Sequence, residues 1–211
     1  MDLQGEYIAI GAESIITKVE LWGHHYALKS RPSKPYLLPE IDSMLRTSRT
    51  SRECKALTIA RTLGVPTPAV HSIDLKDCTI LMDFIVGQQL KEVASSEKGT
   101  NLRELCFQFG QYMAYLHREG MVHGDPTTSN LIVTPSGKIW MIDFGLSELN
   151  ATVEMKGVDL HLIRRALETT HWNNQDEMLE ATIEGYTNTL GDETKPILIR
   201  MEEIRERGRY H

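Results

Sequence analysis

The N-terminal part of the chain contains short, largely apolar runs that are rich in the β-branched and aromatic residues typical of β-strands. These runs occupy residues 7–10, 14–21, 26–29, 70–73 and 79–85. Gly11 and Gly23 stand between the first three runs, where the chain has to turn. The pattern therefore predicts a meander of three strands followed by a further strand pair.

Most of the remaining chain follows the helical period. Residues 42–63 are predicted to form a helix that is broken near residues 46–51, and residues 102–119 to form an amphipathic helix. A polar connection is predicted at 86–100, and the chain from residue 157 to its end is again helical. Strands first and helices afterwards predict an α+β fold. Its N-lobe is small and β-rich with one main helix, and its C-lobe is a reduced helical lobe.

Length and cysteine content limit the class of protein. The 211 residues suit a single domain of two lobes, with the N-lobe at about 1–85 and the C-lobe at about 86–211. We expect no membrane span and no secretory signal, because no long apolar run is present. Cys54, Cys78 and Cys106 lack the spacing of a metal site. They indicate reduced thiols and a cytoplasmic protein, or a nuclear one if the source is a eukaryote.

Basic residues gather at two places although the net charge is -6. The first group is Arg46, Arg49, Arg52 and Lys55, and the second is Arg200, Arg205, Arg207 and Arg209. The net charge excludes a nucleic-acid interface over the whole surface, but a local basic patch can still bind phosphate groups. Each group is equally compatible with a solvated helix face.

The candidate chemistry lies in two motifs. His-Gly-Asp at 123–125 is followed by Asn130, and Ile-Asp-Phe-Gly at 142–145 supplies a second aspartate. In kinase-like phosphoryl transfer, one carboxylate orients or deprotonates the attacking hydroxyl or water, while an amide oxygen and a second carboxylate hold Mg²⁺ on the nucleotide phosphates. The spacing predicts Asp125 as the catalytic residue, and Asn130 and Asp143 as metal ligands. The fold class becomes a bilobal protein-kinase-like fold.

Upstream, Lys29 closes a predicted strand, where its cation can pair with the phosphates of ATP. Such a lysine needs a carboxylate to position it, and Glu53 in the following helix is the leading candidate. Glu40 is the second candidate, although it lies beside Pro39 at a helix start, where an acidic residue ordinarily stabilises the helix dipole.

Further contacts to ATP are predicted at two segments. The turn at Gly11, Ala12 and Glu13 replaces a glycine-rich loop, and its backbone amides can approach the phosphates. The segment around Met82 is predicted to connect the lobes and to bind adenine through the backbone carbonyl of Asp83 and the backbone amide of Ile85.

Two residues near the motifs have supporting roles. His123 is predicted to pack and to hydrogen-bond to backbone, and not to act as a general base. Asp159 follows Gly157 at a predicted helix start. It either only caps that helix or also accepts hydrogen bonds from the catalytic-loop backbone.

Two features of protein kinases are missing. Gly124 stands where they have an arginine that reads activation-loop phosphorylation, and Thr127 where they have a lysine that steadies the transferring phosphoryl group. Loss of that cation weakens transfer to an acceptor hydroxyl more than it weakens Mg-ATP binding. Slow transfer, or hydrolysis of ATP by water, is therefore a plausible native activity.

These residues resemble one family over nearly the whole chain: the small atypical kinase/ATPase of the KEOPS (EKC) complex, known as PRPK in animals and related to RIO kinases. The most specific matches are HGDxTTSN at 123–130 and IDFGLS at 142–147. Other matching segments are residues 11–13, 49–53, 64–68, 156–160, 168–171 and 205–209.

The resemblance implies a Mg-ATP site built from Lys29, Glu53, Asp125, Asn130 and Asp143, and a role in threonylcarbamoyladenosine (t6A) modification of tRNA. It implies a threonylcarbamoyltransferase subunit as the partner of the C-lobe and a small regulatory subunit as the partner of the N-lobe. It further implies contact with tRNA through the tail, here Arg205, Arg207 and Arg209. Pro126 departs from the family's leucine, and the tail is less basic than usual.

Two other functions stay open. A stand-alone small-molecule phosphotransferase would carry an acceptor-binding insertion in its helical lobe, for which the chain after Gly145 leaves little room. A pseudokinase scaffold would not need the intact set of lysine, glutamate, asparagine and two aspartates.

Overall fold

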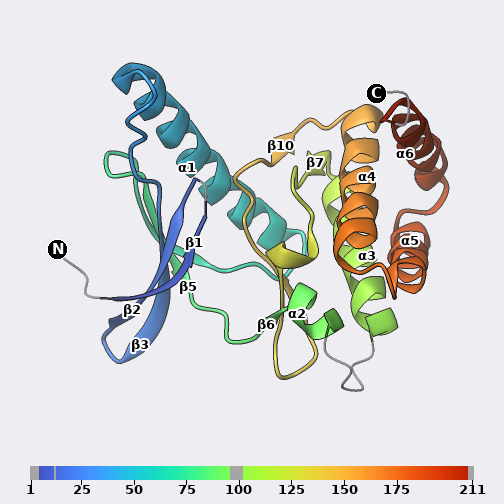
Figure 1. Ribbon diagram of the computed structural model, residues 1–211, viewed down its shortest axis with the longest axis horizontal. Coiled ribbons are helices and arrows are strands. Elements are labelled where there is room, and N and C mark those ends of the chain that lie inside the picture. The colour runs from blue at the N-terminus through green and yellow to red at the C-terminus, as the bar shows by residue number, and fades with distance from the viewer. Residues whose placement is uncertain (1–4, 12, 96–101, 209–211) are drawn as a thin grey trace.

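A computed structural model describes residues 5–11, 13–95 and 102–208. Strands gather at one end of the molecule and helices at the other, with the long helix α1 lying between the N-terminal sheet and the helical part (Figure 1). The predicted α+β kinase-like fold is confirmed. No helix in the described ranges is both long and apolar enough to cross a membrane.

The N-terminal sheet contains the strands predicted from the runs of β-forming residues. They are β1 (Gly5–Ile10), β2 (Ile15–Leu21), β3 (His24–Ser30), β4 (Val70–Asp74) and β5 (Thr79–Asp83). The strand order is β1-β2-β3-β5-β4, and each neighbouring pair is antiparallel. This order puts β3 at the centre, with Lys29 opposite Ile80 of β5 and Ile16 of β2.

Helix α1 (Pro39–Thr62) is continuous, so the predicted break near residues 46–51 is wrong. Serine and threonine favour caps and turns over helix interiors, but here local bonds satisfy them. Thr50 donates its hydroxyl to the carbonyl of Arg46 at 2.8 Å, and Arg46 pairs with Asp42 one turn earlier at 2.7 Å. Burial of the face that carries Thr50 and Glu53 adds tertiary support.

The predicted polar connection at 86–100 is partly structured. It contains the short strand β6 (Gln88–Gln89) and helix α2 (Leu90–Ser95), of which Leu90 and Val93 are buried. Strand β6 pairs with β8 (Leu131–Val133), and β8 pairs with β9 (Ile139–Met141). This small sheet carries the two motifs at its ends.

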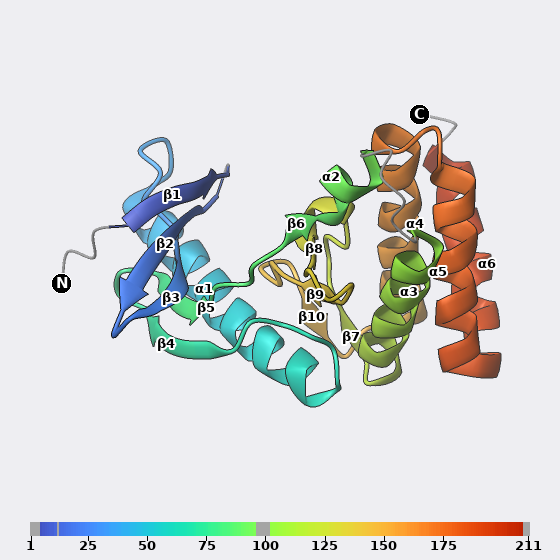
Figure 2. The same ribbon diagram turned by 90° about the horizontal axis from the view of Figure 1, so that it is seen from below.

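Four long helices among the described residues of the helical part pack in two pairs. They are α3 (Leu102–Arg118), α4 (Val153–Thr170), α5 (Gln175–Leu190) and α6 (Thr194–Gly208). Helix α3 packs on α5, and α4 packs on α6 (Figure 2). The first pair approaches closely, because a Cβ atom on Gly110 would lie 1.9 Å from the carbonyl oxygen of Thr182. Helix α4 begins at Val153 and not at Gly157, and Thr152 accepts a hydrogen bond from the amide of Met155.

Candidate active site

A cavity of about 610 Å³ lies between the N-terminal sheet and the motif hairpin. Seven of the residues predicted to bind ATP or metal line it: Gly11, Lys29, Met82, Asp83, Ile85, Asn130 and Asp143. A smaller adjoining cavity of about 230 Å³ is lined by Glu13 and Asp125 as well as by Lys29 and Asp143. Ala12 lies outside the described residues. The fold therefore brings together residues that are far apart in the sequence.

Lys29 binds two carboxylates at once. Its Nζ lies 2.7 Å from Oε1 of Glu53 on α1 and 2.7 Å from Oδ1 of Asp143 after β9. Lys29 is 2% exposed and Glu53 is fully buried. Glu53 is thus the partner of the lysine, whereas Glu40 is exposed in the first turn of α1, where it complements the helix dipole.

Asp143 is held in an unusual backbone conformation. Its φ is +61°, a left-handed value that is rare for a residue with a side chain. Burial disfavours the charged carboxylate, but the Lys29 ammonium and the amide of Gly145 outweigh it and lower the pKa of Asp143. The group is therefore an anion at neutral pH, and its side chain is 45% exposed toward the cavity.

Asn130 and Asp125 are joined across the loop between β7 (Met121–Val122) and β8. The amide nitrogen of Asn130 donates to both the carboxylate Oδ2 and the backbone carbonyl of Asp125, each at 2.9 Å. Because the amide nitrogen makes both bonds, the Oδ1 of Asn130 stays available to a metal. A neutral oxygen and the Asp143 carboxylate are hard ligands that suit Mg²⁺ bound to phosphates.

His123 is buried and serves the loop structurally. Its Nε2 lies 3.2 Å from the carbonyl of Ile142, its Nδ1 lies 3.3 Å from the amide of Asp125, and its ring packs against Phe144. Burial lowers the pKa of His123 despite the nearby carboxylates, so the ring is neutral at neutral pH. A neutral ring can donate through Nε2 and accept at Nδ1, which fits both contacts.

Asp159 does not cap a helix, since it lies inside α4. Its carboxylate accepts hydrogen bonds from the amide of His123 at 2.8 Å and from the amide of Gly124 at 2.9 Å. Of the two readings of Asp159, contact with the catalytic-loop backbone is the right one. The carboxylate thereby ties α4 to the motif loop.

Steric crowding explains why residue 124 is a glycine. Its φ is +83°, and a Cβ atom there would lie 2.2 Å from the carbonyl oxygen of Leu146. An arginine, as in protein kinases, cannot occupy this backbone position without moving the segment that follows Asp143.

Two supporting contacts were not predicted. Thr128 and His171, both buried, are joined by a hydrogen bond of 2.9 Å that ties the motif loop to the end of α4. Nothing in their spacing indicates this contact, because 43 residues separate them.

Arg31 makes the other contact. Its guanidinium forms an ion pair with Oε2 of Glu53, and Nη1 lies 3.4 Å from the hydroxyl of Thr50. Arg31 is buried and lines the smaller cavity beside Asp125 and Asp143. Glu53 therefore uses one oxygen for Lys29 and the other for Arg31, which fixes the plane of its carboxylate.

Arg31→Lys is expected to lower the free energy of unfolding by about 1–2 kcal/mol, because lysine keeps the charge but cannot contact Glu53 and Thr50 together. Urea unfolding of the two proteins measures the difference. Lys34→Arg, an exchange of the same two residue types outside this buried group, is the control and should be neutral. Equal stability of Arg31→Lys and the parent chain would contradict the role of Arg31.

The other predicted contacts are placed as follows. Glu13 forms an ion pair with Arg49 of α1 and so links the turn after β1 to that helix. Asp83 uses its backbone amide to bind Ala69, and its side chain accepts from the amide of Ala69 at 3.0 Å and contacts His71 at 2.7 Å. These bonds hold Asp83 in place at the wall of the larger cavity.

The C-terminal arginines face acidic neighbours. Arg205 lies 3.5 Å from Glu202, and Arg207 lies 3.7 Å from both Glu154 and Glu203. Arg209 is outside the described residues. Exposed pairs of this kind are weak, so they hold the two side chains only loosely.

A β-rich lobe and a helical lobe that enclose a Lys–Glu pair, an Asp–Asn pair and a further aspartate define a protein-kinase-like class. Comparison with known proteins agrees: residues 40–157 match the RIO domain family. The KEOPS complex subunit Bud32 of Pyrococcus abyssi is 41% identical over 184 residues, covering 87% of this chain and 83% of that protein. A probable serine/threonine-protein kinase BUD32 homolog of Archaeoglobus fulgidus is 36% identical, covering 96% and 95%.

The chain therefore belongs to the RIO domain family and, within these comparisons, to the Bud32 family. The resemblance predicted from the motifs is confirmed. A probable bifunctional tRNA threonylcarbamoyladenosine biosynthesis protein of Methanobrevibacter smithii is 36% identical over 210 residues. That match covers 100% of this chain but only 38% of the relative, so the chain corresponds to one part of the bifunctional protein.

Proposed function

We propose that this protein is a Mg-ATP-dependent atypical serine/threonine kinase and ATPase that supports t6A modification of tRNA as a subunit of KEOPS. The observation that carries the proposal is the ion pair of Lys29 with Glu53, facing Asp143 in the cavity that Asn130 also lines. The names of the relatives, which include a KEOPS subunit, a probable kinase and t6A biosynthesis proteins, support the setting.

Each residue has a role in this proposal. Lys29 holds the α- and β-phosphates of ATP, Glu53 and Arg31 orient Lys29, and Asn130 and Asp143 hold Mg²⁺. When bound, Mg²⁺ neutralises charge on the phosphates. With ATP bound, Lys29 would contact the phosphates in place of Asp143, and the Asp143 carboxylate would then hold the metal. The ATP site is completed by Gly11, Ala12, Glu13, Met82, Asp83 and Ile85.

Asp125 orients the nucleophile and takes its proton. Its carboxylate is held by Asn130, and the loop around it is held by Asp159, His123 and Thr128. Thr127 supplies no cation beside it, so the transferring phosphoryl group has less stabilisation toward a protein hydroxyl. We infer that water is the main acceptor and that serine phosphorylation is the slower reaction.

The partners follow from the same proposal. A threonylcarbamoyltransferase subunit binds the C-lobe at about 86–211, a small regulatory subunit binds the N-lobe at about 1–85, and Arg205, Arg207 and Arg209 contact tRNA. A cytoplasmic location fits this setting.

The test incubates the protein with γ-labelled Mg-ATP and separates free phosphate from labelled protein. The parent chain is expected to give mostly free phosphate, and Asp143→Ala, which lacks a metal ligand, to give neither product. Mostly labelled protein would make kinase activity primary. If neither product depends on Asp143, a scaffold without catalysis replaces the proposal, provided that the partners and tRNA do not restore the dependence.

A further inference from the structure

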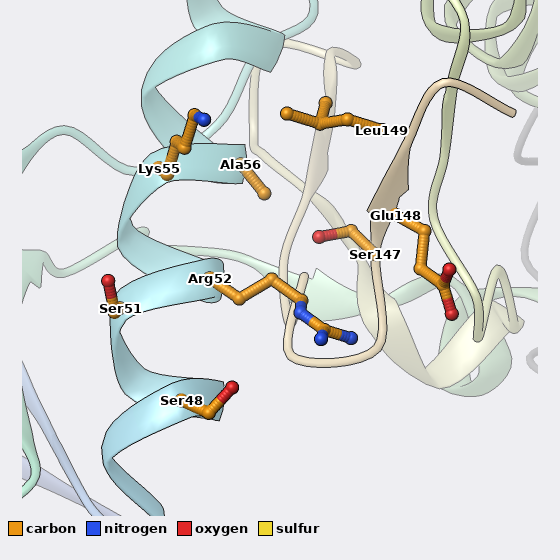
Figure 3. Close-up of a pocket in the computed structure, with 8 residues that line it drawn as sticks. All are labelled: Ser48, Ser51, Arg52, Lys55, Ala56, Ser147, Glu148 and Leu149. Atoms are coloured by element: carbon orange, nitrogen blue, oxygen red, sulfur yellow. The ribbon is translucent and has the colours of Figure 1, made fainter.

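A third cavity, of about 370 Å³, lies outside the candidate active site, between α1 and the segment 147–149. Helix α1 contributes Ser48, Ser51, Arg52, Lys55 and Ala56 to its wall, and the segment contributes Ser147, Glu148 and Leu149 (Figure 3). Ser48, Arg52 and Lys55 are spaced at four and three residues, which puts them on one face of the helix. The cavity thus joins a basic helix face to the chain just after the Ile-Asp-Phe-Gly motif.

Of the first basic group of the sequence, Arg46 and Arg49 have acidic partners, whereas Arg52 and Lys55 line this cavity. Arg46 is neutralised by Asp42, and Arg49 by Glu13. Arg52 and Lys55, in contrast, form no ion pair with the acidic residues that the structure describes. In a chain with a net charge of -6, two cations three residues apart on one helix and without an acidic partner are available to an external anion. The Arg52 guanidinium extends toward the segment, and the Lys55 side chain lies one turn along the helix, so it has to swing toward Arg52 to share an anion with it (Figure 3).

The donors at the cavity suit a phosphate group. Arg52 extends from α1 toward the segment, and the Ser48 hydroxyl lies on the same side of the helix (Figure 3). Arginine binds phosphate oxygens through two parallel N–H donors, lysine adds a point charge, and a serine hydroxyl adds a third donor. Ser147 is not counted as a donor, because its hydroxyl already donates to the carbonyl of Phe144 at 2.7 Å.

Glu148 is the one acidic residue of the wall and reduces the local charge to about +1 at neutral pH. Its side chain leaves the segment on the side away from α1 (Figure 3). The neutralised Arg46 and Arg49 disfavour a long nucleic-acid backbone, which needs a continuous basic track. A single phosphate group remains the anion of best fit.

We propose that this cavity is a binding site for one phosphate group, held by Arg52, Lys55 and Ser48. The three ligand side chains all lie on α1, and Arg52 directly precedes Glu53, the partner of Lys29. The site faces the segment 147–149, in which Glu148 pairs through its backbone with Val122. A bound phosphate therefore places an anion beside the part of α1 that positions Lys29. The group comes from free inorganic phosphate or from a phosphorylated serine.

The test titrates the protein with inorganic phosphate and with O-phosphoserine, and follows the backbone amide signals of α1 by NMR. A non-hydrolysable ATP analogue with Mg²⁺ is present throughout, so that phosphate cannot bind at Lys29 and contribute to the signal. The parent chain, Arg52→Gln with Lys55→Gln, and Arg165→Gln are compared. Arg165 is an exposed helical arginine on α4 and serves as the matched control. Thermal unfolding without phosphate checks that all three proteins are folded.

We expect the double variant to bind phosphate at least about tenfold more weakly than the parent chain, with Arg165→Gln unchanged. Tighter binding of inorganic phosphate than of O-phosphoserine identifies the free ion as the source, and the reverse identifies a phosphorylated serine. Equal affinity in all three proteins overturns the proposal. So does binding of a short single-stranded RNA, but not of phosphate, that needs Arg52 and Lys55. The variants are compared with one another under the same conditions. The difference in phosphate affinity can therefore be interpreted even if the protein does not bind ATP.

Discussion

Glu53→Ala is expected to lower the free energy of unfolding by about 3–5 kcal/mol, since it leaves two buried cations without their shared anion. Lys29, Arg31 and Glu53 are each at most 4% exposed, and Glu53 is the carboxylate that both cations contact. With Asp143 included, the four charges sum to zero. Removal of Glu53 leaves a net positive charge on two side chains that are almost fully buried.

The measurement is thermal unfolding by calorimetry, where a chain of this size loses about 2–4 °C for each kcal/mol. Glu40→Ala is the matched control, because Glu40 lies on the same helix but is exposed. Its loss should stay below about 1 kcal/mol, the usual contribution of an acidic residue to a helix dipole. Similar losses in the two variants would show that the buried ion pairs do not stabilise the fold.

The contacts of Glu53 also show how far sequence reasoning reaches. Five site residues could be predicted because phosphoryl transfer demands their residue types at recognisable spacings. They are Lys29, Glu53, Asp125, Asn130 and Asp143. The structure brings them to one region, although the role of each in catalysis still depends on the proposed function.

Arg31 was missed although a signal exists. Residues two apart on a strand point to the same face, so a cation two positions after Lys29 can reach the same partner. An arginine at the end of a strand is usually a surface residue, and only the position of α1 shows that Glu53 lies between the two cations.

The errors in the predicted secondary structure have a different cause. The run of serine and threonine near residues 46–51 has low helix propensity, yet α1 passes through it because Thr50 and Glu53 are buried against the site. Helix α2 was read as polar connection, since six residues carry too little periodicity to be recognised. In both segments the helix is stabilised by burial against the rest of the protein, and the local sequence does not show that burial.

Asp125→Asn is expected to reduce ATP turnover by about 10²–10⁴-fold while Mg-ATP binding is largely kept. The exchange removes the charge and the proton-accepting oxygen but preserves the shape of the side chain. An asparagine oxygen can still accept the hydrogen bond from Asn130, and the backbone carbonyl that Asn130 also contacts is unchanged. Steady-state hydrolysis of Mg-ATP gives the turnover, and calorimetric titration with a non-hydrolysable analogue gives the binding.

Two further variants separate the role of Asp125 from other effects. Asp143→Asn should lose binding and turnover together, because it weakens the metal ligand set and removes the ion pair with Lys29. Asp192→Asn, an exposed aspartate beyond α5, should match the parent chain in both measurements. If Asp125→Asn turns over ATP within about threefold of the parent chain, proton transfer to Asp125 does not limit the reaction. Water would then be activated without a protein base, and Asp125 would only shape the loop that Asn130 holds.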